Sequence, residues 1–527
     1  MKLKPIMKAS LLSMALFGAS FSANATIENP LVTSYLSTQT VIATQAAEQA
    51  DTLVVVVPEG AAIQLAGWST STVEQVARIA EVAGFEGKMG QQETVNAPAG
   101  LGVTRLILVG VGDPAEAART KVEDAGAALA NMINNTKAET VQVNAELISN
   151  PVYNGRILAQ LAHGVDLRNY RFDRYQSSPA ARPAQTYHYH VTSRSHAERE
   201  FEAMQALAQG VFLARELTNL PGSAGYPAAF AEYARQALEP LGVNVTILTP
   251  EQVLEMGMGA LYGVSQGSQH KAHLLIAHWE GSSEQPIALV GKGNTHDTGG
   301  YNLKTNAASI HRMPTDKAGG AAVVGAVAAI AGQRLEQNVV GVVPLSQNSI
   351  SGEALLPGDV VTTGSGLTIE VANTDAEGRL ILADGLWYVR EHYNPRAIAD
   401  IATLTGAKMT AVGTDFSAVF ANNELVYETL AEAAETVNER VWRLPLDPRF
   451  ERSISSRIAD MKNTGSPGAS AGAMLLQRFV GDTPWIHIDM AGNAQVDGPS
   501  GIHPAGATGY GVRMLTEWVK VYPKTAE

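Results

Sequence analysis

Acidic and basic side chains gather in three short segments of the sequence, GKGNTHDTGG at 291–300, DKAGG at 316–320 and NTDAEGR at 373–379. Asp375 and Glu377 are two positions apart, so in an extended segment their side chains point to one side. Two carboxylates aimed together repel each other unless a cation lies between them. Taken singly, 316–320 also suits a helix cap and 373–379 a solvated turn, but the three segments together predict a cation site.

The acids of these segments are Asp297, Asp316, Asp375 and Glu377. Each lies at the end of an expected strand or at the start of an expected helix, where an open α/β sheet builds its site. Carboxylates with few histidines suit Mn²⁺, Mg²⁺ or Zn²⁺. Four negative charges offset two divalent cations, so we expect a two-metal centre that holds and deprotonates a water molecule.

Other kinds of site fit the sequence less well. Lys292 follows an expected buried strand in a glycine-rich segment, but neither GxxxxGK[ST] nor GxGxxG occurs, which disfavours a nucleotide site. A two-metal phosphoesterase usually adds histidine ligands and a basic phosphate clamp, whereas the sequence near the acids offers Arg379 and a few lysines. We expect no nucleophile elbow, which disfavours a Ser-His-Asp hydrolase. Cysteine is absent, so thiolate ligands and disulfides are excluded.

The elements that position these residues alternate between strands and helices, which predicts an α/β fold. We expect buried strands where β-branched residues run together, at 52–57, 104–109, 287–290, 339–343 and 398–401. We expect helices in the alanine-rich segments at 113–135 and 318–330. The alternation of strands and helices predicts a smaller N-terminal α/β domain at 26–175 and a larger catalytic α/β domain at 200–527. A polar segment at 176–199 is expected to connect them.

Composition limits the class of protein. The 527 residues are 45% hydrophobic and 17% charged, a globular balance that excludes disorder as the main state. The formal net charge of −13 disfavours non-specific binding to nucleic acid or anionic lipid. No apolar run of membrane-spanning length follows the first 25 residues, so we expect no membrane partner.

The first 25 residues have the three features of a secretory signal peptide. Lys2, Lys4 and Lys8 precede an apolar stretch at 9–21, and Ala23-Asn24-Ala25 offers the small residues that a signal peptidase requires. Removing residues 1–25 and their three lysines changes the net charge from −13 to −16. These features predict an exported protein, either periplasmic or secreted.

The three segments resemble the signature of the leucyl aminopeptidase (cytosol aminopeptidase) family of two-metal exopeptidases. NTDAEGR at 373–379 matches the most specific motif of that family without a change. Further segments look familial: YRFDRY at 170–175, ARELTNLP at 214–221, ATLTGA at 402–407, ADMKNTG at 459–465 and GATGYGVR at 506–513. The resemblance implies a catalytic domain around a twisted mixed sheet, peptide substrates with a free N-terminus, and a homo-hexamer of two trimers.

The resemblance also implies roles for single residues. Lys292 would be an amine ligand with a lowered pKa, Asp297 and Glu377 would bridge two metal ions, and Asp316 and Asp375 would each complete one site. The ions would be Mn²⁺ or Zn²⁺, with Mg²⁺ or Co²⁺ as alternatives, and would hold a bridging water or hydroxide.

The remaining roles that the resemblance implies concern the substrate. Lys304 would stabilise the oxyanion, and Arg379 would hold a bicarbonate base. The substrate-binding residues would be Met313, Thr403, Leu404 and Gly406.

The sequence departs from the family at the edge of the site. His296 stands where an aromatic residue is usual, Pro314-Thr315 alters the segment before Asp316, and the loop from Lys304 to Asp316 is one residue longer than in common members. We expect these changes to affect specificity before activity, and expect His296 and His311 to lie outside the ligand set. A non-catalytic metal- or DNA-binding member of the family and a two-metal phosphoesterase stay open as alternatives.

Overall fold

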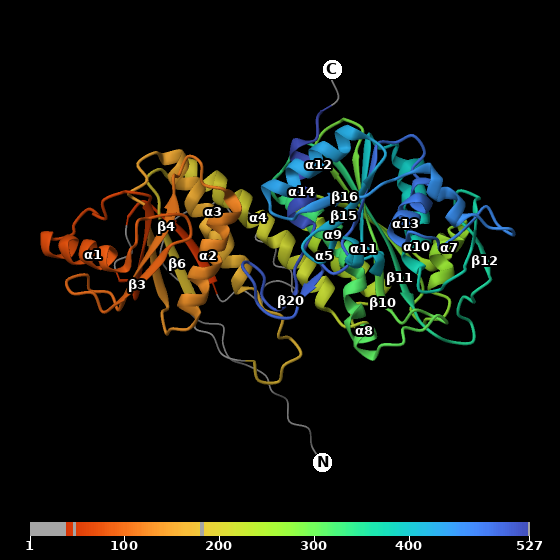
Figure 1. Ribbon diagram of the computed structural model, residues 1–527, viewed down its shortest axis with the longest axis horizontal. Coiled ribbons are helices and arrows are strands. Elements are labelled where there is room, and N and C mark those ends of the chain that lie inside the picture. Colours follow the sequence, from red (N-terminus) through yellow and green to blue (C-terminus); the bar gives the residue numbers. More distant parts are fainter. Residues whose placement is uncertain (1–37, 46–48, 180–183, 525–527) are drawn as a thin grey trace, which may run out of the picture.

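The computed structural model describes residues 38–45, 49–179 and 184–524, which fold into two α/β lobes (Figure 1). The N-terminal lobe is built on a six-stranded sheet and the C-terminal lobe on a nine-stranded mixed sheet. This arrangement confirms the predicted fold class, a smaller α/β domain followed by a larger one. The predicted signal peptide at 1–25 lies outside the described residues.

The N-terminal sheet has the strand order β1-β6-β5-β2-β4-β3, and its neighbours are parallel except for β3, which is antiparallel to β4. The central strands β2 and β4 are nearly continuous runs of buried Val, Ile and Leu, as expected for strands that are covered on both faces. The strands are β1 (Thr38–Ala43), β2 (Thr52–Pro58), β3 (Gln92–Asn96), β4 (Arg105–Gly112), β5 (Thr140–Asn144) and β6 (Gln185–His190).

Helices cover both faces of the N-terminal sheet. Helix α1 (Thr70–Ala83) packs on one face, whereas α2 (Arg119–Asn134), α3 (Pro151–Asn169) and the start of α4 (Arg194–Asn219) pack on the other. Helix α4 then continues into the core of the C-terminal lobe and so connects the two lobes.

Strand β6 lies within the segment 176–199 that we expected to be a polar connection. Its residues alternate between buried and partly exposed, with Tyr187 and Tyr189 in the core of the lobe. The Tyr189 ring lies 5.3 Å from that of Phe201. We did not predict this alternation of buried and partly exposed residues from the sequence, because the segment contains many polar residues. The expected domain boundaries, 26–175 and 200–527, stay predictions.

The C-terminal sheet has the strand order β16-β15-β18-β14-β9-β11-β8-β7, with β10 paired to β11. Its centre is parallel, because β14, β9 and β11 run in the same direction. At one side β8 is antiparallel to β11, and β7 is antiparallel to β8. The strands are β7 (Asn244–Leu248), β8 (His273–Glu280), β9 (Ile287–Gly291), β10 (Gly293–Asp297), β11 (Asn338–Asn348), β14 (Ala397–Ala402), β15 (Ser417–Ala421), β16 (Val441–Arg443) and β18 (Trp485–Asp489).

Helices also cover both faces of the C-terminal sheet. One layer comprises α4, α5 (Pro227–Leu238), α9 (Ala318–Gly332), α12 (Glu424–Thr436) and α14 (Val512–Val521); the other comprises α7 (Gly259–Val264), α10 (Glu377–Tyr393) and α13 (Gly468–Gln477). Helix α9 is buried almost throughout, as its small residues predict. It packs closely on α4, since a Cβ at Gly210 would lie 2.3 Å from the carbonyl oxygen of Gly325.

Short elements complete the C-terminal lobe. They are α6 (Pro250–Glu255), α8 (Ala307–Arg312), α11 (Gly406–Val412), β12 (Val360–Thr362), β13 (Thr368–Glu370), β17 (Met461–Lys462), β19 (Gln495–Val496), β20 (Gly506–Ala507) and 3-10 turns at Glu239–Leu241, Met313–Lys317 and Pro448–Ile454. Within the described ranges, no helix combines the length and the apolar character needed to cross a membrane.

Candidate active site

The five side chains predicted to be metal ligands come together at one edge of the C-terminal sheet. Lys292 follows β9, Asp297 ends β10, and Glu377 begins α10. Asp316 lies in the 3-10 turn before α9, and Asp375 lies in the turn before α10. Carboxylate oxygens of Asp297, Asp375 and Glu377 all lie within 4.8 Å of one another. This is the carboxyl edge of parallel strands, where α/β sheets place their sites.

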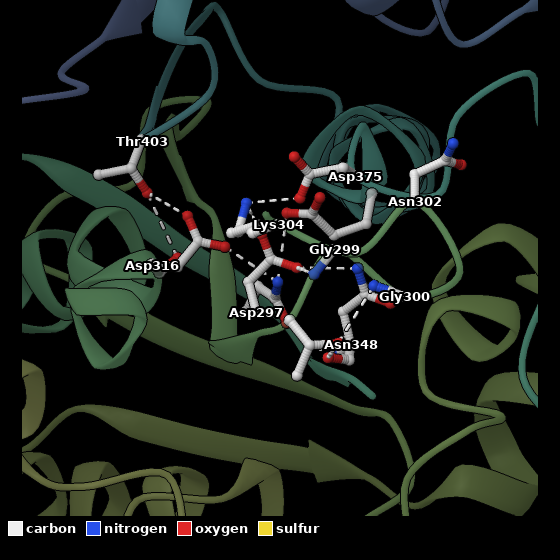
Figure 2. A network of polar contacts seen from close by, with 12 residues as sticks. Asp297, Gly299, Gly300, Asn302, Lys304, Asp316, Asn348, Asp375 and Thr403 are labelled. Carbon is white, nitrogen blue, oxygen red and sulfur yellow. Dashed lines mark hydrogen bonds and ion pairs between the residues drawn. The ribbon is translucent and has the colours of Figure 1, made fainter. Parts of the chain in front are cut away.

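Two lysines lie among the four carboxylates. Lys292 Nζ donates to Asp316 Oδ1 at 2.7 Å and lies 2.8 Å from Glu377 Oε1. Lys304 Nζ lies 2.7 Å from Asp297 Oδ2 and 2.5 Å from Asp375 Oδ1, as Figure 2 shows. The lysines therefore offset two of the four negative charges.

The excess of carboxylates changes their proton affinities. Burial raises the pKa of Asp316 to about 8 against the opposing effect of Lys292, and burial together with Asp297 raises that of Asp375 to about 6. Burial lowers the pKa of Lys292, but the carboxylates of Asp316, Glu377 and Asp297 outweigh it and leave the pKa raised. Without metal ions the three nearby carboxylates therefore favour the charged ammonium of Lys292, whereas the lowered pKa that we expect is that of a metal-bound amine.

Neutral side chains hold the carboxylates in place. Asn294 Nδ2 donates to Asp316 Oδ2 at 2.9 Å, and Thr403 Oγ1 donates to Asp316 Oδ1 at 2.7 Å. Asn348, the last residue of β11, donates to Asp297 Oδ1 at 2.8 Å (Figure 2). We did not predict positioning roles for Asn294 and Asn348, although both lie at the same strand ends as the acids.

Two glycines let the backbone pass close to the acids. Gly299 and Gly300 have φ of +90° and +60°, values that L side chains rarely adopt. A Cβ at Gly299 would lie 2.9 Å from Asp375 Oδ1. The Gly299 amide donates to Asp297 Oδ1 at 2.9 Å, so this turn joins the two acids (Figure 2).

Arg379 lies behind the carboxylates, in the first turn of α10. Its guanidinium is buried and donates to the main-chain oxygens of Asn463 and Gly468, the latter at 3.1 Å. A Cβ at Gly472 would lie 3.2 Å from Arg379 Nε, so glycine there leaves space beside the guanidinium. Burial lowers the pKa of Arg379, and the carboxylates of Asp489 and Glu377 partly offset this effect.

A cavity of about 1200 Å³ opens over the carboxylate cluster. The residues predicted to bind substrate, Met313, Thr403, Leu404 and Gly406, all line it, as does Lys304. Arg379 is not among the described residues that line it.

The two histidines near the acids lie away from this cavity. His296 packs against the backbone at Gly222, where a Cβ would lie 2.9 Å from the His296 Cβ. His311 is exposed on α8. Neither lines the cavity, which agrees with their expected place outside the ligand set.

Buried Lys408 of α11 fastens the wall of the cavity. Its Nζ donates to the carbonyl oxygens of Gly413 and Ala491, each at 2.9 Å, and to Asn493 Oδ1. Burial lowers the pKa of Lys408 to about 8. The lysine thereby connects α11 to the loop after β18, a contact that its position in the sequence does not reveal.

Two segments carry the residue pattern of a nucleophile elbow, GVSQG at 263–267 and GASAG at 468–472. Ser265 ends α7, where its hydroxyl donates to the Tyr262 oxygen and accepts from the Ala272 amide, each at 2.9 Å. Ser470 lies inside α13. Neither serine occupies a strand-to-helix turn, so these two GxSxG segments, whose presence we did not expect, are not nucleophile elbows.

Comparison with known proteins gives matches along most of the chain. Residues 212–516 match the catalytic domain of the cytosol aminopeptidase family, and residues 39–179 match its N-terminal domain. The probable cytosol aminopeptidase 1 of Shewanella oneidensis is 44% identical, over 85% of this chain and 89% of its own length. The probable cytosol aminopeptidase of Rhodopseudomonas palustris strain BisA53 is 42% identical, over 86% of this chain and 91% of its own.

Solved structures share the fold of both lobes. The bottromycin maturation enzyme BotP in complex with Mn has a TM-score of 0.78 at 30% identity, over 90% of this chain and 99% of its own. A mutant of tomato leucine aminopeptidase has a TM-score of 0.79 at 30% identity, over 93% of this chain and 97% of its own.

These relatives contradict the export predicted from residues 1–25. Both relatives from bacteria are named cytosol aminopeptidases, a name that points to the cytoplasm. The prediction of a signal peptide and of a periplasmic or secreted protein is therefore wrong. It depended on three short composition features, whereas the match to these relatives extends over at least 85% of the chain.

Proposed function

The chain belongs to the cytosol aminopeptidase family, and from that premise we propose that its carboxylate cluster is the reaction centre of a metal-dependent aminopeptidase. The enzyme releases N-terminal amino acids from peptides. The observation that carries this proposal is the convergence of Asp297, Asp375 and Glu377, whose oxygens lie within 4.8 Å at one end of a large cavity.

The donor set fits divalent cations. Asp297, Asp316, Asp375 and Glu377 bring more negative charge than Lys292 and Lys304 offset, and buried like charges are stable together only when cations lie among them. We propose that these four carboxylates hold two ions, of Mn²⁺ or Zn²⁺, or alternatively of Mg²⁺ or Co²⁺, and that Lys292 becomes a further ligand by losing its proton as the ions bind. When bound, such ions supply Lewis acidity and make a water molecule between them a nucleophile near neutral pH.

For Lys304 we propose stabilisation of the transition state. It lines the cavity beside Asp297 and Asp375, and those carboxylates raise its pKa against the effect of burial. A charged ammonium at this position donates to the carbonyl oxygen of the scissile peptide as negative charge develops there.

For Arg379 we propose that it holds an anion, bicarbonate. Its partners in the structure are two neutral carbonyl groups, and glycine at 472 leaves space beside Nε. The guanidinium would keep such an anion near Glu377, two residues away in the chain. The anion would there be the base for a proton of the attacking water.

Selectivity for the N-terminus follows from recognition of a free amine. Asp316 lies on the cavity wall and offers an oxygen that accepts a hydrogen bond from the substrate α-amine. Met313, Thr403, Leu404 and Gly406 lie around it and contact the first side chain of the peptide. We also propose the homo-hexameric assembly that the family resemblance implies; light scattering at several concentrations tests it.

Hydrolysis of Leu-Gly and of N-acetyl-Leu-Gly, with Mn²⁺, with Zn²⁺ and after chelation, tests the proposed function. We expect release of leucine from Leu-Gly only in the presence of a divalent ion. Acetylation removes the basic amine, so N-acetyl-Leu-Gly should be at least a hundredfold poorer as a substrate. Equal cleavage of the two peptides, or cleavage that survives chelation, contradicts the proposal.

A further inference from the structure

The cavity over the carboxylate cluster continues to the seam between the two lobes. Its volume of about 1200 Å³ exceeds the roughly 300–1000 Å³ of typical ligand pockets, so a dipeptide leaves much of it unfilled. Its far wall includes Thr120, Glu123 and Asp124 of α2, in the N-terminal lobe, and Arg513 of α14, in the C-terminal lobe. The N-terminal lobe thus contributes to the same cavity as the reaction centre.

Buried ion pairs and hydrogen bonds hold this far wall together. Glu123 pairs with Arg513 across the seam and with Arg119 Nε at 2.8 Å. Arg168 of α3 donates to the His503 carbonyl oxygen at 2.7 Å. The segment before β20 therefore lies directly between the lobes (Figure 1).

The same segment passes close to Asp124. A Cβ at Gly501 would lie 3.0 Å from Asp124 Oδ1, and both residues line the cavity. The far wall is therefore a preformed surface rather than an open gap between lobes.

The cations of the cavity wall are already paired. Among the described residues that line it, Arg312 lies 3.0 Å from Asp497 and Arg513 pairs with Glu123, while the two lysines contact the carboxylate cluster. Burial and two neighbouring arginines lower the pKa of His503 to about 3, so this histidine is neutral. The C-terminal carboxylate of a dipeptide therefore meets no uncommitted positive charge on this wall.

The exposed charge along the cavity is net negative. Of the described charged residues that line it, the exposed ones are Asp124, Asp415, Asp497 and Arg312, and Asp124 lies at the seam end. A carboxylate at the mouth of a cleft attracts a cation over a distance of about one Debye length, which is about 10 Å at 0.1 M salt. A peptide that extends from the reaction centre toward the seam therefore gains from a positive side chain and loses from a negative one.

We propose that the seam end of the cavity, at Thr120 and Asp124 of α2, is a subsite for the part of a peptide beyond its second residue and favours lysine or arginine there. The inference rests on the proposed function and adds a substrate class to it. The preferred substrates are oligopeptides with a basic residue a few positions from the N-terminus, rather than dipeptides.

Three substrates of the Mn²⁺-loaded enzyme test this subsite: Leu-Gly-amide, Leu-Gly-Gly-Lys-Gly-amide and Leu-Gly-Gly-Glu-Gly-amide. We expect kcat/KM for the lysine peptide to exceed that for the glutamate peptide about tenfold at 0.05 M salt and about twofold at 0.5 M, because salt screens the attraction. The difference should lie mainly in KM. Calorimetric binding of both peptides with the first peptide bond reduced should give the same preference without turnover.

Two variants locate the preference on α2. Asp124→Lys should reduce the ratio of the lysine to the glutamate peptide to about one or below. Thr120→Trp fills the seam end and should lower kcat/KM for both long peptides roughly tenfold relative to Leu-Gly-amide. Glu59→Lys makes the same charge change on an exposed residue of the N-terminal lobe that does not line the cavity, and it should change none of these ratios.

The outcomes separate the subsite from the proposed function. Equal kcat/KM for the two charged peptides in the wild type, or an unchanged ratio in Asp124→Lys, overturns the subsite while hydrolysis of Leu-Gly-amide leaves the aminopeptidase function intact. Absence of hydrolysis of all three peptides overturns the function and the subsite together. If Thr120→Trp does not fold, the exposed Asp124 position still decides the result.

Discussion

Two clusters of buried carboxylates lie at opposite ends of one cavity, and their charges are compensated differently. At the reaction centre four acids share two lysines, and burial raises the pKa of Asp316 to about 8. At the seam Glu123 pairs with Arg513 and Arg119, which outweigh its burial and lower its pKa to about 2. Asp316 and Glu123 are both buried, so the difference between their pKa values comes from the opposing charges around each.

The difference separates a structural role from a chemical one. A buried carboxylate that is fully paired stabilises the contact between lobes only while its partners remain, because loss of one partner leaves the other charge buried and alone. A buried cluster with too many carboxylates is costly unless cations enter it, which is the condition for a metal centre. Each prediction below alters one of the two clusters and uses the other as its control.

Glu377→Gln should have the largest effect, on metal binding and activity rather than on stability. It removes one of the three clustered carboxylates while keeping the shape of the side chain. We expect kcat/KM for Leu-Gly to fall about a thousandfold or more, since the cluster loses a ligand that both ions need. Thermal unfolding of the metal-free variant should match or exceed that of the wild type. Near-normal turnover contradicts the assignment.

Glu123→Gln should have the next largest effect, and on stability. Arg513 would lose its buried ion pair and Arg119 the nearer of its two paired acids, and breaking a buried pair typically costs about 3–5 kcal/mol. Urea unfolding followed by circular dichroism measures this cost. The folded fraction should retain most of its activity on Leu-Gly, and a free energy of unfolding equal to that of the wild type would show that the seam pair is not structural.

Lys304→Ala should separate chemistry from metal binding. If Lys304 donates to the developing oxyanion, kcat should fall about a hundred- to a thousandfold, the usual loss for one such donor. Bound metal, measured by elemental analysis of the dialysed protein, should stay at the wild-type level. Loss of metal together with activity would instead make Lys304 part of the ion site.

Acid should lower the free energy of unfolding of the wild type more than that of Glu123→Gln. The folded-state pKa of Glu123, about 2, lies below its ordinary value of 4.5, so its contribution is fully present above pH 4.5 and is lost as the pH falls toward 2. Between pH 6 and pH 3 we expect the wild type to lose up to about 2–3 kcal/mol more than Glu123→Gln. Parallel stability curves for the two proteins would show that Glu123 is not held ionised.

The sequence predicted which acidic residues come together, because these residues follow strands that meet at one edge. Asp297, Asp375 and Glu377 carry charge in conspicuous short segments, so their types and positions were enough. Asn348 was missed because an amide at the end of a buried strand shows no charge pattern, although it donates to Asp297.

The seam was beyond prediction from the sequence. Glu123 and Arg513 are 390 positions apart, and each alone resembles an ordinary helix residue. Strand β6 was missed for a different reason, because its buried tyrosines alternate with polar residues that resemble a connection. Contacts set by the packing of distant elements have no local signal, whereas a site built at strand ends does.

The most direct test of the account is the number of Mn²⁺ ions that each protein binds, measured by isothermal titration calorimetry after chelation and dialysis. The unbalanced cluster should bind two ions per chain in the wild type and in Glu123→Gln, and fewer in Glu377→Gln. The same number of ions in the wild type and in Glu377→Gln, or loss of ions in Glu123→Gln but not in Glu377→Gln, would contradict the claim that the excess of carboxylates at residues 297, 316, 375 and 377 is the metal centre.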